Sequence, residues 1–243
     1  MIDNLADERF KGSIRLFGKE VFLRLQNAHV MVVGVGGVGS PCAEALCRAG
    51  VGELTLVDAD TIELSNSNRQ IHTLSSTLGQ SKAQALAKRL LDINPNLKVH
   101  PQVLMLDEHN IEEFMQNSPL YVAEAIDDIK AKVRVVDYLY KKHKVFVVSG
   151  GAGGRIDPSC LHLSDMAKAQ GDGLIAHLRT LLRKDYGFPK GGKKMDIMCT
   201  WSNEVPIYSI EEGKQVFGAL MSVTASAGLL MASYLIRSIV GQN

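Results

Sequence analysis

Short apolar runs alternate with longer segments of helical spacing along most of this chain. The apolar runs predict five strands, at Val30–Val33, Glu53–Val57, Lys98–Leu104, Tyr121–Ile126 and Val145–Ser149. The intervening segments repeat apolar residues every third or fourth position and predict helices at Ser40–Ala49, Ser81–Asp92 and Ile129–Lys142. Strands that alternate with helices predict an α/β protein with a doubly wound, mostly parallel sheet.

The two flanking regions have a weaker pattern. Glu8–Leu25 predicts one or two short helices with a turn at Gly18, and Ser164–Lys194 is polar, with few clear strands. Short strands are predicted at Asp196–Trp201 and Val205–Tyr208, and Gly187–Lys194 is predicted to be a mobile loop. We expect residues 1–160 to form an ATP-binding domain with N-terminal helices, and residues 161–243 to extend the same compact unit.

The C-terminal segment Val216–Val240 is long and apolar. A membrane span needs about 20 apolar residues, so the length permits one. The segment is rich in Gly, Ala, Ser and Thr, which suit a helix packed against other protein, so we expect a buried core helix and no stable membrane insertion. The first ten residues lack the apolar core of a signal peptide, and we expect a cytoplasmic protein.

Amino-acid composition excludes few classes of protein. Hydrophobic residues make up 46% of the chain and charged residues 22%, as in ordinary soluble proteins. The 27 basic and 26 acidic residues give a net charge near zero, which neither requires nor excludes a nucleic-acid partner. The four cysteines, Cys42, Cys47, Cys160 and Cys199, form no C-x-x-C pair, so we predict no zinc and reduced thiols.

A glycine-rich turn follows the first predicted strand. Gly34, Gly36, Gly37 and Gly39 would let the backbone approach a phosphate at the start of a helix. Asp58 ends the second strand, where an acidic residue accepts both ribose hydroxyls, and Asp60 follows it. These features alone fit nicotinamide and flavin enzymes as well as ATP-using enzymes.

An Asn- and Arg-rich loop after the second strand favours ATP. Arg69 can form paired hydrogen bonds with phosphate oxygens, Asn68 can donate to them, and Lys82 adds a second cation. Asp127 ends the fourth strand, where a carboxylate can hold a Mg²⁺ ion that bridges phosphates. Singly, each cation could be a solvated surface residue and Asp127 a helix N-cap. Their joint placement at strand ends makes it improbable that all of these simpler interpretations hold.

Several motifs resemble a known superfamily. GVGGVG, DADTIELSNSNRQ, the segment Gly79–Lys82 and AIDD are similar to the ubiquitin-activating-like adenylyltransferases of molybdopterin and thiamine biosynthesis. Within that superfamily, RFKGSIRLFG, NRQIH, INP, SGGAGGRIDP and FGALMSVTASAG most resemble the tRNA threonylcarbamoyladenosine dehydratases. The first resemblance covers about residues 9–160, and the second covers nearly the whole chain.

The resemblance implies ATP-dependent cyclisation of threonylcarbamoyladenosine next to the tRNA anticodon, through an acyl-adenylate. It implies that Asp58 binds ribose, that Asn68, Arg69 and Lys82 bind the triphosphate, and that Asp127 binds Mg²⁺. Arg69, Lys82 and Asp127 are then the expected catalytic groups. The alternative is activation of the C-terminal carboxylate of a small sulfur-carrier protein. It is disfavoured because those enzymes generally carry two zinc-binding C-x-x-C pairs.

The resemblance also implies partners. Family members are homodimers in which an N-terminal Arg reaches the ATP of the partner subunit. The second Arg of their R-Y-x-R pattern is replaced here by Gly12, so Arg9 or Arg15 would act instead, and we expect Arg15. A modified tRNA is the expected substrate, and a sulfur-relay protein is a further candidate partner.

Two segments allow a functional and a structural interpretation. The loop Gly150–Gly154 either lines the substrate or binds Na⁺ or K⁺, or it is a tight connection that needs positive φ. Asp157 after it is expected to stabilise a turn. Cys199 either accepts the acyl group from the adenylate, as in some ubiquitin-activating relatives, or packs in the core.

Basic residues gather in two places. The segment Arg179–Lys194 interleaves Tyr186 and Phe188 with cations and is a candidate grip for an anticodon loop, by phosphate contacts and stacking. The segment Lys141–Lys144 is expected to be a solvated helix end.

Overall fold

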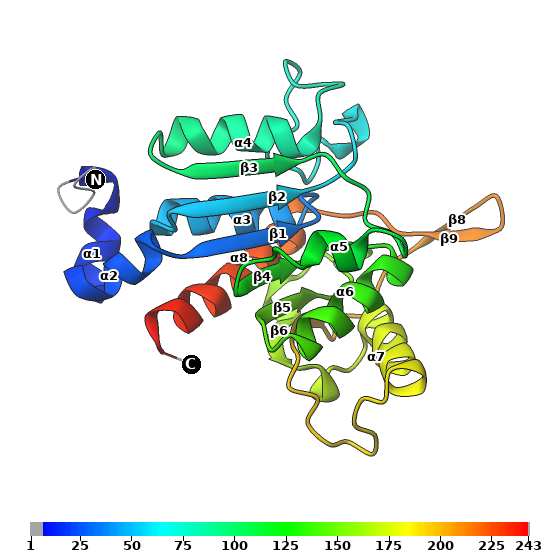
Figure 1. The fold of residues 1–243 in the computed structure, drawn as a ribbon. Helices are drawn as coiled ribbons and strands as arrows, with labels where there is room; N and C mark the ends of the chain where they lie inside the picture. Colours follow the sequence, from blue (N-terminus) through cyan, green and yellow to red (C-terminus); the bar gives the residue numbers. More distant parts are fainter. Residues whose placement is uncertain (1–6, 243) are drawn as a thin grey trace.

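A computed structural model describes residues 7–242. Its centre is a seven-stranded sheet in the order β3-β2-β1-β4-β5-β7-β6 (Figure 1). The strands are β1 (His29–Val33), β2 (Glu53–Val57), β3 (Lys98–Gln102), β4 (Tyr121–Glu124), β5 (Val145–Ser149), β6 (Leu161–Asp165) and β7 (Met198–Ser202). All pairs are parallel except β6 with β7, so the predicted mostly parallel sheet is confirmed.

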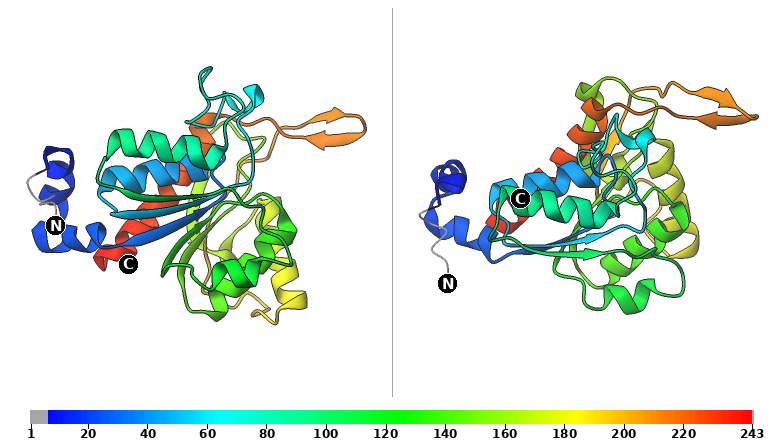
Figure 2. Two further views of the ribbon diagram at one scale, coloured as in Figure 1. Left: turned by 45° about the horizontal axis from the view of Figure 1, so that its top comes forward. Right: turned by 90° about the horizontal axis from the view of Figure 1, so that it is seen from above.

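Helices cover both faces of this sheet (Figures 1 and 2). They are α1 (Lys11–Phe17), α2 (Lys19–Gln26), α3 (Gly39–Ala49), α4 (Lys82–Ile93), α5 (Ile111–Met115), α6 (Ile129–Lys141), α7 (Gly173–Asp185) and α8 (Met221–Val240). Residues of α3, α4 and α8 share one buried cluster, and residues of α5, α6 and α7 share the other. This two-sided cover is the doubly wound arrangement that the alternating pattern predicts.

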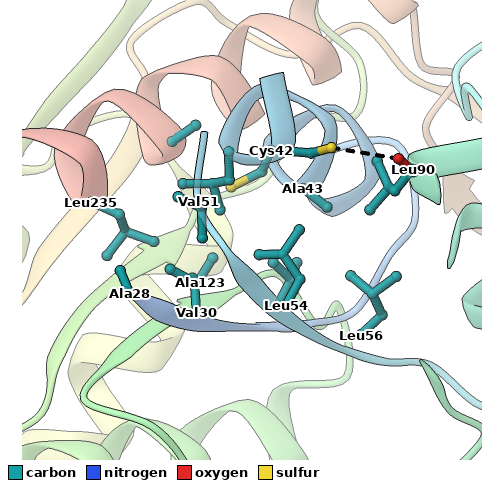
Figure 3. Packing of buried hydrophobic residues seen from close by; sticks show 14 of the residues in the cluster. Ala28, Val30, Cys42, Ala43, Val51, Leu54, Leu56, Leu90, Ala123 and Leu235 are labelled. Carbon is teal, nitrogen blue, oxygen red and sulfur yellow. Dashed lines mark hydrogen bonds between the residues drawn. The ribbon is translucent and has the colours of Figure 1, made fainter. Parts of the chain in front are cut away.

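Alternation along the central strand β1 supplies both cores. Val30 and Val32 of β1 belong to the first cluster, while Met31 and Val33 belong to the second. Successive strand residues point to opposite faces, so one apolar run serves two layers. In the first layer, Leu235 and α3 pack over the sheet (Figure 3).

The apolar C-terminal segment forms α8 and packs beside α3. Its composition and 20-residue length would suit a membrane span, yet about half of its most apolar stretch is buried within the protein. A Cβ on Gly228 would lie 2.2 Å from the Val38 carbonyl oxygen, so only glycine allows this close approach of the two helices. The packing supports the core-helix interpretation.

The second half of the chain departs from the prediction in three places. Val205–Tyr208 is not a strand, since Pro206 lacks an N–H for a sheet ladder. The chain instead forms a projecting hairpin of β8 (Ser209–Glu211) and β9 (Lys214–Val216), so α8 begins later than expected (Figure 1). Asp196 has φ +56°, a left-handed conformation, and β7 therefore starts only after it.

Sequence inspection missed β6, α5 and α7. Ile175, Leu178 and Leu182 of α7 are buried at helical spacing, but the polar residues His177, Arg179 and Thr180 between them hid the repeat. Strand β7 pairs with β5 of the first 160 residues, and β6 pairs with β7 at the sheet edge, so the second segment continues the sheet that the first one builds.

Candidate nucleotide-binding site

The carboxyl ends of the parallel strands open into one cleft of about 990 Å³. This is where ligands bind in open α/β sheets. Loops after β1, β2, β4 and β5 meet the start of α8 here. The side chains and glycines used below come from its walls: Gly34, Gly36, Gly37, Asp58, Asp60, Asn66, Arg69, Gln70, Lys82, Asp127, Gly150, Gly151, Gly153 and Thr224.

Glycine is sterically required at two positions of the turn after β1. Gly34 has φ +84°, and a Cβ there would lie 2.6 Å from the Ala125 carbonyl oxygen. Gly39 does not line the cleft, but a Cβ on it would lie 1.8 Å from the carbonyl oxygen of Gly34. Gly36 and Gly37 face the cleft between these two supports, at the N-terminus of α3.

Asp58 is held by backbone N–H groups at the end of β2. One carboxylate oxygen accepts from Val35 at 2.8 Å, and the other accepts from Asp60 at 2.9 Å. Burial raises the pKa of the Asp58 carboxyl, and the two backbone hydrogen bonds oppose that shift. Each oxygen keeps a further lone pair, so the group can still accept hydrogen bonds from a ligand.

Lys82 and Asp60 form an ion pair on the same wall. Lys82 Nζ lies 2.7 Å from Asp60 Oδ2, and the Lys82 backbone N–H also donates to the Asp60 carbonyl. The lysine side chain is only 9% exposed while the aspartate is 58% exposed. Lys82 is the first residue of α4, and Asp60 fixes the direction of its buried ammonium group.

Arg69 lines the cleft, whereas Asn68 does not. The Arg69 guanidinium donates to the Ser65 carbonyl at 3.0 Å and to Asn68 Oδ1 at 2.9 Å. The Asn68 amide donates to the Ala219 carbonyl at 2.7 Å. Asn68 thus links Arg69 to Ala219, which precedes α8, and does not face the cleft as expected. Asn66 lines the cleft wall instead.

Asp127 projects from the turn after β4. Within residues 7–242 its carboxylate makes no hydrogen bond or ion pair, and it lies in the cleft wall. The N-cap of α6 is the next residue, Asp128, which accepts from the Ala131 N–H at 2.8 Å. In the described part of the chain no three His, Cys, Asp or Glu residues cluster as a metal cage. A lone carboxylate still suits Mg²⁺, which binds few protein groups when substrate phosphates complete its shell.

A buried ion pair beneath the cleft was not predicted. Lys132 Nζ of α6 lies 2.7 Å from Glu124 Oε2 of β4, and both side chains are fully buried. Lys132 also donates to the Ile126 carbonyl at 2.8 Å, and Glu124 accepts from the Ile126 N–H at 2.9 Å. These contacts fix the backbone that leads into Asp127. The signal was a glutamate in an otherwise apolar strand and a lysine on the inner face of the next helix.

The loop Gly150–Gly154 forms another wall. A Cβ on Gly150 would lie 2.5 Å from the Thr200 carbonyl oxygen, so glycine is needed for the close approach. The Asp172 carboxylate, at the N-cap of α7, accepts from Gly151 at 3.1 Å and lies 3.5 Å from the buried Arg155 guanidinium. Asp157 caps the following turn, as expected, by accepting from the Ser159 N–H.

Comparisons with known proteins agree with this geometry. The model of the ThiF family matches residues 10–243. The chain belongs to the ThiF family. The tRNA threonylcarbamoyladenosine dehydratase of Escherichia coli (strain K12) is 35% identical over 260 residues, covering 100% of this chain and 97% of that protein. The dehydratase of Haemophilus influenzae is 36% identical, covering 98% and 95%.

Solved structures extend this family likeness. The E. coli dehydratase in complex with ATP matches with a TM-score of 0.92 and 36% identity, covering 100% of this chain and 98% of that one. The MOCS3 adenylyltransferase and sulfurtransferase of Drosophila willistoni is 33% identical, but over only 56% of this chain and 29% of that protein. The similarity to the dehydratases thus covers both residues 1–160 and residues 161–243.

Cys199 lies away from the cleft of this ThiF-family protein. The thiol is fully buried in β7 and is not part of the cleft wall. Burial raises the pKa of the Cys199 thiol, which disfavours the thiolate that a nucleophile needs. The placement favours the packing interpretation.

Phe188 of the basic segment Arg179–Lys194 is not available to stack on bases. Phe188 is buried against Tyr140, with ring centroids 4.5 Å apart, and Tyr186 lies beneath the Lys141 ammonium group. The stacking prediction is therefore wrong for Phe188, which anchors the loop to α6, while Tyr186 is partly exposed and its stacking stays a prediction. Lys190 and Lys193 remain exposed for phosphate contacts.

The N-terminal arginines lie far from the cleft within one chain. Helices α1 and α2 stand at the end of the sheet opposite the hairpin β8–β9 (Figures 1 and 2). Arg9 is paired with Asp7 at 2.7 Å, while Arg15 is exposed and has no polar partner in residues 7–242. Of the two candidates, Arg15 is the one whose guanidinium has no polar partner in the described residues.

Proposed function

We propose that this ThiF-family protein catalyses ATP-dependent dehydration of threonylcarbamoyladenosine in tRNA. The observation that carries the proposal is the cleft in which Arg69, Lys82 and Asp127 converge, in a chain that matches dehydratases over its full length. A protein related only through the glycine turn would not need this triphosphate-binding set.

The chemistry requires activation of a carboxylate. A carboxylate resists nucleophiles because it is negatively charged and would have to expel oxide. In the proposed first step a carboxylate oxygen attacks the α-phosphorus of ATP, and pyrophosphate leaves. The neighbouring carbamoyl group then attacks the acyl carbon, the ring closes, and AMP leaves with the original carboxylate oxygen. Both reacting groups belong to one nucleoside, so proximity strongly favours closure.

Each wall has a role in this proposal. The backbone at Gly36 and Gly37 receives phosphate oxygens, and Asp58 accepts the ribose hydroxyls. Arg69 and Lys82 stabilise the charge that develops as pyrophosphate leaves. Asp127 would hold Mg²⁺, which when bound supplies further charge neutralisation on the phosphates. Cation binding by the Gly150–Gly154 loop, as Na⁺ or K⁺, stays a prediction.

We further propose a cytoplasmic homodimer in which Arg15 reaches the ATP of the partner subunit. A groove of about 370 Å³ between α1 and α8 is bordered by Leu16, which is 75% exposed, and by Leu229. Exposed apolar residues beside an unpaired arginine are consistent with a subunit contact there. Association with a sulfur-relay protein also stays a prediction.

The test is mass spectrometry of tRNA nucleosides from cells that lack the gene for this chain. The threonylcarbamoyl nucleoside should be heavier by one water than in cells in which the wild-type chain is restored, and an Asp127→Asn chain should not restore it. An unchanged nucleoside would contradict the proposal. Pyrophosphate exchange that depends on a protein ending in Gly-Gly, but not on modified tRNA, would instead favour activation of a sulfur-carrier protein.

A further inference from the structure

Helix α8 begins at the cleft without a side-chain cap. Its N-cap residue, Leu220, offers no acceptor. Within residues 7–242 no protein group accepts from the backbone N–H of Met221 or Ser222. The first N–H groups of a long helix carry partial positive charge and suit an anion.

The Thr224 hydroxyl, one turn into this helix, also lacks a partner. Thr224 lines the cleft and is 4% exposed, and its Oγ1 makes no hydrogen bond. By contrast, Ser226 and Ser238 of the same helix donate to the carbonyl four residues back, at 2.7 and 2.9 Å. A buried hydroxyl without a partner is unfavourable, so the absence of even the usual helical bond points to a ligand.

The neighbours of Thr224 define what this ligand touches. Thr224 Oγ1 lies 3.2 Å from the position that a Cβ on Gly37 would occupy, so the hydroxyl adjoins the phosphate loop. On the other side, the Gly154 N–H donates to the Gly218 carbonyl at 2.7 Å, which ties the entry to α8 to the Gly150–Gly154 loop. The start of α8 therefore lies between the nucleotide and the glycine-rich wall beyond it.

We propose that the α8 N-terminus and the Thr224 hydroxyl form an oxyanion subsite that receives the carboxylate to be activated. The inference rests on the proposed function, because it names the group of the substrate that binds there. A phosphate oxygen of ATP has the same chemistry, but Arg69 and Lys82 already serve the phosphates. Threonine in a helix populates two χ1 rotamers, so rotation can turn the hydroxyl into the cleft.

Neutral donors suit a carboxylate that must act as a nucleophile. A full cationic partner would withdraw charge from the attacking oxygen. A hydroxyl and partial helix charges hold the group beside Gly37 while leaving it reactive toward the α-phosphorus.

The test compares wild type with Thr224→Val, which removes the hydroxyl at nearly constant volume. Dissociation constants are measured for tRNA carrying threonylcarbamoyladenosine, for the same tRNA with unmodified adenosine, and for ATP. Thr73→Val is the matched control, since Thr73 Oγ1 is also buried without a partner but lies outside the cleft wall. Thr224→Ser keeps the hydroxyl and should rescue.

We expect Thr224→Val to reduce the preference for modified over unmodified tRNA roughly ten-fold, as for loss of a hydrogen bond to a charged group, with ATP binding and thermal stability retained. An unchanged preference overturns the subsite. Weaker ATP binding with the preference intact overturns the carboxylate assignment in favour of a phosphate. A wild-type protein with no preference for modified tRNA would overturn the proposed function itself.

Discussion

Lys132 Nζ and Glu124 Oε2 lie 2.7 Å apart with both side chains fully buried, directly beneath the turn that carries Asp127. Removing one partner leaves an uncompensated buried charge, so Lys132→Met should lower the free energy of unfolding by about 3–5 kcal/mol. Denaturant unfolding measures this effect. The exposed neighbour Lys130 is the control, and Lys130→Met should change little.

The paired variant Lys132→Met with Glu124→Leu should recover much of that stability, because no isolated charge remains. It should still lose activity, since the contacts of both residues with Ile126 position the turn. Full activity in the double variant would show that the pair has only a structural role.

Asp127 and Asp128 are adjacent carboxylates with different environments. Asp127→Asn should reduce Mg²⁺-dependent turnover about a hundred-fold or more while leaving the melting temperature unchanged, because the side chain has no polar protein partner in the described residues. Asp128→Ala should do the reverse, costing about 1 kcal/mol of stability through loss of the α6 cap. Equal effects of the two changes on turnover would remove the metal role from Asp127.

Substitution of two glycines in the turn after β1 should have separate effects, one on fold stability and the other on ATP affinity. Gly39→Ala forces a Cβ to within 1.8 Å of a carbonyl oxygen and should destabilise the fold by roughly 3 kcal/mol. A Cβ on Gly36 meets nothing closer than 3.7 Å, so Gly36→Ala should fold normally but bind ATP more weakly, since the backbone faces the cleft. Thermal unfolding and calorimetric titration of ATP check the two parts, and normal ATP affinity of Gly36→Ala would contradict the phosphate role.

His72 makes stability depend on pH. Its ring is buried, neither nitrogen has a hydrogen-bond partner in the described residues, and burial lowers its pKa from 6.5 to about 4. Above about pH 6.5 both folded and unfolded states hold it neutral. As pH falls toward 4 only the unfolded state gains the proton, so stability should decline by roughly 3 kcal/mol.

The measurement is the free energy of unfolding of wild type minus that of His72→Leu, followed from pH 7 to pH 4. The difference should fall across this range. The same subtraction with His109→Leu is the control for replacing an exposed histidine, because the His109 side chain is 84% exposed. A flat difference for His72 would mean that its ring is protonated in the folded protein.

Local signals explain which parts could be predicted. The apolar run into Gly34 and the acidic end of β2 each occupy a few consecutive residues. Asp58, Arg69, Lys82 and Asp127, which follow predicted strands, all line one cleft in the structure, and their roles there stay predictions. The role of Asn68 could not be read in this way, because its partner Ala219 lies 151 residues away. Thr224 lies even farther from Gly37 in the sequence, and only the packing of α8 on α3 brings the two residues together.

Residue composition gave wrong predictions where the same side chains suit either of two structural roles. Tyr186 and Phe188 stand among cations, as in a nucleic-acid grip, yet Phe188 anchors their loop to α6. Val205–Tyr208 is apolar enough for a strand, but Ile207 donates its N–H to the Gly154 carbonyl and so supports the cleft wall. Tertiary contacts decided both cases.

Isotope transfer from the substrate to the nucleotide tests the central claim most directly. Modified tRNA whose threonylcarbamoyl carboxylate carries heavy oxygen is incubated with the purified protein, ATP and Mg²⁺, and the products are weighed by mass spectrometry. We predict that the label appears in AMP, because an acyl-adenylate passes one carboxylate oxygen to the α-phosphate. Label in inorganic phosphate together with ADP, or unlabelled AMP alongside dehydrated tRNA, would contradict activation by adenylation in this cleft.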